Sequence, residues 1–263
     1  MNSRHRPRIR HPARSIGSAI SSSRIHDAPV GPNSARRSHP PTLVELAHEA
    51  LSSTEHGYDL LAPKFDASPF RTPDRLLDVV REELREDGPW DRALDLCCGT
   101  GAGMRTVGPL AYRITGLDRS RGMLEQARLN HGYEATWVRA DALELPFRQA
   151  FDLIVTFGAL GHILPADETR FLDGVWHALR PGGTFCLVTA PMPPFFSPAH
   201  LASRTFNALM HVRNALWRPP FVMYYLTFLL PEVAAELERQ GFAVELRPLS
   251  GRWRRVTLVV ASR

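Results

Sequence analysis

Short apolar runs alternate with longer amphipathic stretches through the middle of this chain. Five of the runs have the length and the branched or aromatic composition of buried strands, at residues 93–96, 112–118, 135–140, 151–157 and 184–190. Between them, apolar residues recur at helical spacing, as with Met123, Leu124 and Ala127 after the cap residue Ser120. Strands that alternate with helices in this way predict an α/β fold built on a mostly parallel sheet.

The C-terminal part of the chain follows a different pattern. Residues 242–249 and 255–261 are β-rich runs joined by a short turn that contains Gly251, and this arrangement predicts a β-hairpin. One strand of a hairpin must run antiparallel, so we expect a Rossmann-like, seven-stranded sheet that is mostly parallel and ends in an antiparallel hairpin. Dinucleotide-dependent dehydrogenases use a second half-sheet with its own glycine turn, and the pattern has no counterpart of it.

Residues 191–230 interrupt the alternation between the fifth strand and the last helix. The segment is rich in aromatic residues, is broken twice by prolines, and contains a helical stretch at 201–217. Because it leaves the carboxyl end of a strand, the edge at which open α/β sheets bind ligands, we expect a helical cap over that edge. We expect Phe206, Met210 and Trp217 to line a substrate pocket there, with packing on the domain as the alternative.

The most informative chemical motif is ALDLCCGTGAG at residues 93–103, a short strand that breaks into a glycine turn and opens a helix. Gly99 and Gly101 leave no Cβ between the backbone and a ligand, so the turn predicts a nucleotide-cofactor site, although glycines also form ordinary turns. Asp118 ends the next strand, where its oxygens can accept both hydroxyls of an adenosine ribose. Asp141 follows the third strand at the same edge.

Taken in order, these pieces resemble the class I S-adenosylmethionine-dependent methyltransferases from about Thr42 to the C-terminus. The strings LDxxxGTG, DxSxxMLxxA, ADAxxLPF and FDxIV look most like the broad group that contains quinone-biosynthesis and small-molecule methyltransferases. The resemblance implies S-adenosylmethionine as the cofactor. The residues that it places around this cofactor are Phe65, Asp95, Cys97, Gly99, Gly101, Asp118, Arg119, Met123, Asp141, Ala142 and Phe157.

One segment departs from the family pattern. Residues 58–66, YDLLAPKFD, resemble a YDxxAxxYD segment that partly covers the cofactor in many family members. Phe65 stands where a tyrosine is usual, which removes a hydroxyl from that position. Its ring can still shield a sulfonium through a cation–π contact, and a core packing role is the alternative.

Methyl transfer requires an acceptor held in line, exclusion of water and, for a hydroxyl or activated carbon, removal of a proton. His162, in the run GALGHI just beyond the fourth strand, is the candidate catalytic base, and a brace for the next helix is the alternative reading. This chemistry requires no metal. Because the segment 191–230 is rich in apolar and aromatic residues, we expect methyl transfer to a small, apolar or aromatic acceptor.

Two other functions stay open at this point. The arginines of residues 191–230 interleave with apolar residues, which suits an anionic acceptor or peripheral contact with an anionic membrane. A methyltransferase acting on a lipid or an isoprenoid quinone at a membrane surface is therefore one alternative. A non-catalytic binding scaffold with the same fold is the other, and the intact acid and glycine set argues against it.

Composition separates a basic N-terminal segment from the rest of the chain. Residues 1–40 hold eight arginines and a single acid with little apolar periodicity, so we expect a disordered tail. The whole chain carries a net charge of +5, which leaves the expected methyltransferase domain, residues 41–263, slightly acidic. A domain without a basic footprint is not expected to bind nucleic acid.

Cysteine usage indicates the compartment. Cys97 and Cys98 are adjacent in the glycine turn and Cys186 lies in a predicted core strand, so we expect three free thiols and a cytoplasmic protein. No closely spaced cluster of histidines and cysteines suggests a metal site. The pattern does not determine the oligomeric state.

Overall fold

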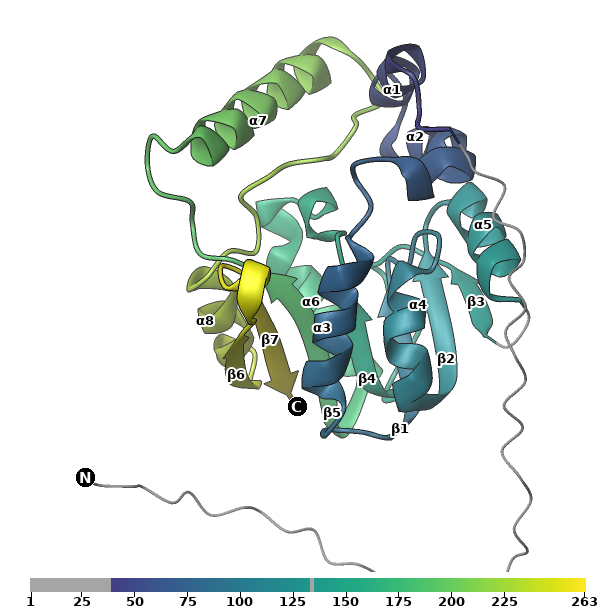
Figure 1. The fold of residues 1–263 in the computed structure, drawn as a ribbon, viewed down its shortest axis with the longest axis vertical. Helices are drawn as coiled ribbons and strands as arrows, with labels where there is room; N and C mark the ends of the chain where they lie inside the picture. Colours follow the sequence, from purple (N-terminus) through teal and green to yellow (C-terminus); the bar gives the residue numbers. More distant parts are fainter. Residues whose placement is uncertain (1–38, 133–134) are drawn as a thin grey trace, which may run out of the picture. The chain divides into compact units, whose positions relative to one another are not determined.

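The computed structural model describes residues 39–132 and 135–263. Its centre is a seven-stranded sheet in the order β3-β2-β1-β4-β5-β7-β6 (Figure 1). The strands are β1 Trp90–Leu96, β2 Ala111–Asp118, β3 Thr136–Arg139, β4 Phe151–Thr156, β5 Leu179–Thr189, β6 Ala243–Pro248 and β7 Thr257–Ser262. Strands β1 to β5 pair in parallel, and β7 runs antiparallel to both β5 and β6. The predicted fold class is confirmed, whereas the expected tail lies almost wholly outside the described residues.

Helices connect the strands. The α-helices are α1 Leu43–Ala50, α2 Thr54–Leu61, α3 Asp74–Leu84, α4 Ala102–Val107, α5 Arg121–His131, α6 Glu168–Ala178, α7 Pro198–Leu216 and α8 Glu232–Arg239. Short 3₁₀ helices are η1 Ala62–Ala67, η2 Gly108–Leu110, η3 Leu160–His162, η4 Pro165–Asp167 and η5 Gly251–Trp253. Among the described residues, none of the helices combines the length and the hydropathy needed to cross a bilayer.

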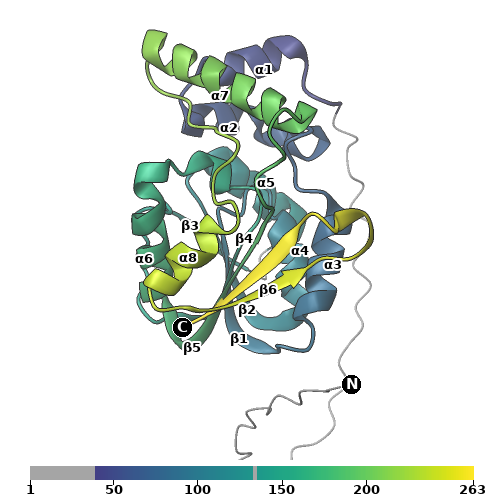
Figure 2. The same ribbon diagram turned by 90° about the vertical axis from the view of Figure 1, so that its left-hand side faces the viewer.

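Strands β1, β4 and β7 bury both of their faces, as their continuous apolar runs require. Along β1, Ala93 belongs to a core formed with α3 and α4, whereas Leu94 and Leu96 belong to a second core formed with α6 and α8. This alternation follows from the two-residue period of a strand. The view in Figure 2 shows α3 and α4 on one side of the sheet and α6 and α8 on the other.

The fifth strand begins earlier than the sequence predicts. The run LRPGG reads as a turn before a strand at residues 184–190, but it forms the first part of β5. Leu179 pairs with Phe151, and the register then shifts before the ladder continues. Gly182 adopts φ 80° and its N–H donates to the carbonyl of Arg263 over 2.9 Å. The turn residues therefore form hydrogen bonds with the neighbouring strands. The turn is retained as an irregularity within β5.

Helices α1, α2 and α7 lie together beyond the carboxyl ends of the parallel strands, as both views show (Figures 1 and 2). Arg213 of α7 donates to the carbonyl of Ser52 over 2.7 Å. After α7 the chain returns toward the sheet through residues 217–230, and Phe221 packs with Met210 in a small separate core. The insertion and the N-terminal helices thus form one layer over the edge of the sheet.

Candidate active site at the carboxyl ends of the strands

A cavity of about 580 Å³ lies at the carboxyl ends of the central strands and beneath this helical layer. It gathers segments that are far apart in the chain. The predicted site residues that line it are Phe65, Asp95, Cys97, Gly99, Asp118, Arg119, Met123, Asp141, Ala142, Phe157 and His162. Of the residues that the resemblance places around the cofactor, Gly101 alone is not among the lining residues.

The glycine turn explains this difference between Gly99 and Gly101. Both adopt left-handed conformations, with φ of 53° and 90°. A Cβ added to Gly99 would meet open space, because the nearest atom outside the turn, on the Phe65 ring, is 4.0 Å away. A Cβ on Gly101 would lie 2.5 Å from the ring of His131. Gly99 keeps the backbone open to the cavity, whereas Gly101 packs against the ring of His131 on α5 and has a φ that favours glycine.

Asp118 at the end of β2 is held by the backbone around it. Its Oδ2 atom accepts a hydrogen bond from the N–H of Gly99 over 2.8 Å, and its Oδ1 atom accepts from the N–H of Ser120 over 2.9 Å. Burial raises the pKa of this carboxyl group above its ordinary value, while these N–H donors oppose the shift. Each carboxylate oxygen keeps a second acceptor position for a ligand.

Asp95 lies deeper, with only 2% of its surface exposed. Burial raises the pKa of this carboxyl group to about 8, and the nearby charge of Asp118 adds to the effect. The N–H of Met104 donates to it, whereas its Oδ2 atom has no hydrogen-bond partner among the described residues. A Cβ on Gly103 would lie 2.6 Å from both carboxylate oxygens, so a glycine is needed for α4 to pass this close.

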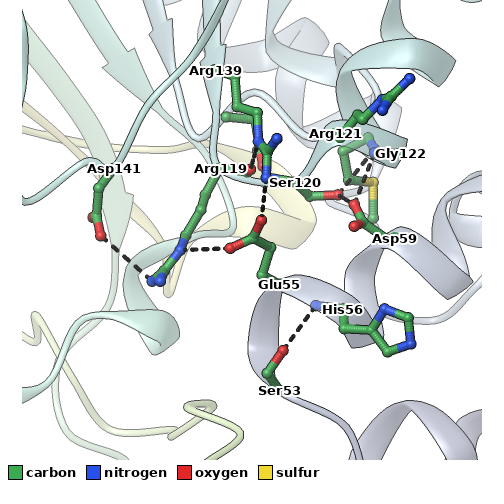
Figure 3. A network of polar contacts seen from close by, with 12 residues as sticks. Ser53, Glu55, His56, Asp59, Arg119, Ser120, Arg121, Gly122, Arg139 and Asp141 are labelled. Carbon is green, nitrogen blue, oxygen red and sulfur yellow. Dashed lines mark hydrogen bonds and ion pairs between the residues drawn. The ribbon is translucent and has the colours of Figure 1, made fainter.

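Helix α2 is attached to the ends of β2 and β3 by ion pairs (Figure 3). Nε of Arg119 donates to Oε2 of Glu55 over 3.2 Å, and Nη1 of Arg119 lies 3.4 Å from Oδ2 of Asp141. Arg139 reaches the second oxygen of Glu55 over 2.5 Å. One glutamate on α2 is therefore bound to the ends of both β2 and β3.

A second attachment joins α2 to the start of α5. Oδ1 of Asp59 accepts hydrogen bonds from Ser120 Oγ over 2.5 Å and from the N–H of Gly122 over 2.8 Å (Figure 3). A Cβ on Gly122 would lie 2.9 Å from the Asp59 backbone, so the two helices approach closely. These contacts close α2 over the strand ends from which Asp118 and Asp141 project.

The cavity also contains a hydrogen-bonded pair that the sequence pattern did not reveal. The Oη atom of Tyr58 lies 2.8 Å from Nε2 of His162, and Nδ1 of His162 lies 2.6 Å from the carbonyl oxygen of Val222. A carbonyl only accepts, so Nδ1 carries the proton, and Nε2 of the neutral ring accepts from the Tyr58 hydroxyl. Burial lowers the pKa of His162 and raises that of Tyr58 above its ordinary value, which keeps both groups neutral.

The segment after α7 forms the wall beside this pair. The N–H of Tyr224 donates to the carbonyl of Gly161 over 2.7 Å, and the N–H of Val222 donates to Thr54 Oγ1 over 2.7 Å. The residues of this segment that line the cavity are Val222, Met223, Tyr224, Tyr225, Leu226 and Thr227. A Cβ on Gly161 would lie 2.7 Å from the carbonyl oxygen of Tyr224, so the segment passes directly over η3.

The prediction that Phe206, Met210 and Trp217 line this pocket is wrong. None of the three is among the lining residues. Met210 is buried against Phe221 and Tyr224, and Trp217 is 53% exposed. The residues of α7 support the wall from behind, because the chain turns back after the helix and places the next segment against the cavity.

Arg71 is a second residue that sequence reasoning missed. It lines the cavity, and its mostly buried guanidinium pairs with Asp66 over 3.1 Å and with Asp74 over 2.6 Å. Asp66 also accepts a hydrogen bond from Thr100 in the glycine turn over 2.6 Å. Arginine is suited to binding a carboxylate, but no spacing in the sequence links residue 71 to the turn. Within the described ranges, no group of three His, Cys, Asp or Glu side chains could hold a metal ion.

Comparisons with known proteins agree with this geometry. A family model described as a methyltransferase domain matches residues 93–183. An uncharacterised methyltransferase of Synechocystis is 38% identical over 106 residues, which are 40% of this chain and 50% of that protein. The ubiquinone biosynthesis O-methyltransferase of Caulobacter vibrioides is 27% identical over 62% of this chain and 66% of its own length. The chain spans about half the length of the first curated relatives it matches, between 43% and 50%.

Solved structures show the same fold. An O-methyltransferase family protein from Burkholderia thailandensis has a TM-score of 0.61 at 18% identity, covering 84% of this chain and 67% of that chain. The DhpI–SAH complex has a TM-score of 0.60 at 18% identity, covering 84% of this chain and 98% of that one. These likenesses show that the chain has the fold of these methyltransferases, and residues 93–183, which contain the glycine turn and the acids after β2 and β3, match the methyltransferase domain.

Proposed function

We propose that the chain binds S-adenosylmethionine in this cavity and catalyses methyl transfer to a small, apolar or aromatic acceptor. The observation that carries the proposal is the position of Asp118, fixed by the N–H groups of Gly99 and Ser120 beside a turn whose Gly99 faces open space. A carboxylate held in this way is prepared to accept the two hydroxyls of a ribose. Curated relatives that carry methyltransferase names support the same reaction.

The residues present fit this cofactor. Asp118 has acceptor positions for the ribose, and Asp141 and Ala142, which line the cavity after the next strand, are the candidates for contact with the adenine. Arg71 is the candidate partner for the carboxylate of the methionine portion, and Phe65 is the aromatic side chain nearest to Gly99. When bound, S-adenosylmethionine supplies a methyl group made electrophilic by its sulfonium.

The wall of the cavity formed by η3 and by the segment from Val222 to Thr227 favours an apolar or aromatic acceptor. This segment brings Met223, Tyr224 and Leu226 against the space. A mostly apolar wall excludes water and binds flat or aliphatic groups through burial of their surface. Relatives named for ubiquinone and menaquinone biosynthesis support an acceptor of this chemical class.

Tyr58 and His162 together can remove a proton from an acceptor hydroxyl. The Tyr58 hydroxyl donates to His162, so lone pairs on its oxygen remain available to an acceptor that enters the cavity. As the acceptor hydroxyl gives its proton to Tyr58 Oη, the Tyr58 proton passes to Nε2 of His162. The carbonyl of Val222 stabilises the resulting imidazolium through Nδ1. His162 thus acts as the base through Tyr58.

Two measurements test the proposal. Isothermal calorimetry with S-adenosylmethionine should show saturable binding, whereas NAD should not bind. Incubation of the full chain with methyl-labelled S-adenosylmethionine and an extract of the source organism, followed by mass spectrometry, should yield a product that has gained one methylene. Absence of donor binding by a folded protein would contradict the proposed cofactor site.

A further inference from the structure

An apolar surface on α7 has no partner in the described part of the chain. We call it the α7 face and define it by the exposed side chains of Leu209, Val212, Leu216 and the following Trp217. On the helix itself, Leu209, Val212 and Leu216 follow the three- and four-residue spacing of one side, and they are 63%, 57% and 77% exposed. Soluble monomers rarely leave several large apolar side chains this exposed on one side of a helix without a partner.

The opposite side of α7 packs against the segment that follows the helix. Met210 packs against Phe221 and Tyr224. Asn207 donates to the carbonyl of Tyr225 over 2.8 Å, and Asn214 donates to the carbonyl of Phe221 over 3.0 Å. These contacts fix the rotation of the helix about its axis, so the α7 face stays outward.

The charge of the segment that contains α7 favours an anionic bilayer over a second copy of the chain as the partner of the α7 face. Residues 191–230 contain three arginines and no aspartate or glutamate, and Arg204 and Arg218 are exposed. A symmetric dimer through this face would bring the same arginines together without a carboxylate from the segment to pair with them. An anionic bilayer offers both an apolar interior for the side chains and negative headgroups for the arginines.

We propose that the α7 face docks on an anionic lipid bilayer, with Leu209, Val212 and Leu216 entering the interfacial layer and Arg204 and Arg218 binding headgroups. Trp217 follows directly on the helix, and its amphipathic ring suits the interface between headgroups and acyl chains. The segment that continues from Trp217 forms the wall of the cavity from Val222 onward. On the proposed function, docking would therefore place the acceptor end of the site next to the bilayer.

Vesicle co-sedimentation of the full chain tests the docking without donor or acceptor, so its result is independent of the proposed function. Binding to vesicles of equal parts phosphatidylglycerol and phosphatidylcholine should exceed binding to phosphatidylcholine alone. Val212→Ser with Leu216→Ser should weaken it by about tenfold or more, because two side chains lose their apolar burial. Arg204→Gln with Arg218→Gln should weaken it by about tenfold on the anionic vesicles only.

Matched control variants separate the α7 face from the basic N-terminal segment, which stays present in every protein. Tyr112→Ser with Leu129→Ser removes two side chains that are 78% and 71% exposed elsewhere on the domain. Arg128→Gln with Arg148→Gln makes the same change in net charge at exposed positions. Both control pairs should bind within about twofold of the wild type. Circular dichroism melts should show that all four variants fold.

Several outcomes would overturn the proposal. Failure of the wild type to bind anionic vesicles would exclude it, and so would wild-type binding by both α7 variants, since the attraction would then belong to another part of the chain. Loss of a dimer in sedimentation velocity for Val212→Ser with Leu216→Ser, without an effect on vesicle binding, would assign the face to a second copy.

A blue shift of tryptophan emission on anionic vesicles, absent in Trp217→Phe, would support the docking directly.

Discussion

Tyr58 and His162 form a hydrogen-bonded pair, with 2.8 Å between the phenolic oxygen and Nε2. They come from α2 and η3, and the carbonyl of Val222 holds the second ring nitrogen at 2.6 Å. This third contact decides the direction of the hydrogen bond, because it leaves Nε2 of the neutral ring as the acceptor. A proton can therefore move toward His162 only through the Tyr58 hydroxyl.

We expect Tyr58→Phe and His162→Ala each to lower turnover by about a hundredfold, as removal of a general base commonly does. Donor affinity measured by calorimetry should stay nearly unchanged. Because the two groups act in series, the double variant should be little worse than either single one. Additive losses, or a parallel loss of melting temperature and donor affinity, would instead identify the pair as a structural brace.

Asp118→Asn should weaken binding of S-adenosylmethionine by at least about tenfold. Hydrogen bonds to a charged acceptor contribute about 1.5–3 kcal/mol each, and the amide offers only one oxygen in place of two. Calorimetry measures the change, and Asp173→Asn on the exposed side of α6 serves as the control. Wild-type affinity in a folded Asp118→Asn protein would contradict the placement of the ribose.

Two glycines with the same backbone requirement allow a sharper test of the turn. Gly99 and Gly251 both have left-handed φ, 53° and 64°, and neither would bring a Cβ into a close contact. Gly99→Ala and Gly251→Ala should therefore each lower the unfolding free energy by about 1 kcal/mol. Only Gly99→Ala should reduce donor affinity, because only Gly99 faces the cavity. Equal donor affinities for the two variants would place the cofactor elsewhere.

The raised pKa of Asp95, about 8, predicts a pH dependence of stability. In the unfolded chain this carboxyl has a pKa of about 3.9, so between these values the folded chain retains a proton that the unfolded chain releases. Stability therefore falls as the pH rises from about 4 to about 8. Asp95→Asn removes this dependence. The unfolding free energy of the variant minus that of the wild type should therefore increase by about 1 kcal/mol or more between about pH 5 and pH 8.

Chemical denaturation at the two pH values measures this difference. Asp173→Asn, at an exposed carboxyl, should shift stability by a similar amount at both. An Asp95→Asn effect that does not change with pH would show that the carboxyl is ionised in the folded protein.

The ion pairs of Glu55 should control how long the donor stays bound. Glu55→Gln weakens the attachment of α2 to Arg119 and Arg139, and partly exposed pairs contribute about 0.2–1 kcal/mol each. We expect donor dissociation in stopped-flow experiments to accelerate by about two- to fivefold, with little change in melting temperature. Glu125→Gln removes a pair with Arg121 within α5 alone, and its dissociation rate should match the wild type.

Local patterns along the chain were sufficient for the fold class and for the gathering of the strand-end residues that we propose bind the cofactor. The order of strands and helices, the glycine turn and an acid directly after a strand are all encoded within short segments. Parallel strands bring their carboxyl ends to one edge, so Asp118 and Asp141 had to meet there once the strands were recognised. Position along a strand thus determined position in the site.

The acceptor half depended on contacts between distant segments. Spacing identifies which residues of α7 share a face, but it does not say which face the protein covers, and so Met210 was assigned to the cavity although it packs behind the wall. Tyr58 and His162 are 104 positions apart, and neither carries a local signal for the other. Gly101 likewise depends on His131 in the next helix. Such pairings arise only from packing, because the free energy that selects them is distributed over the whole tertiary interface.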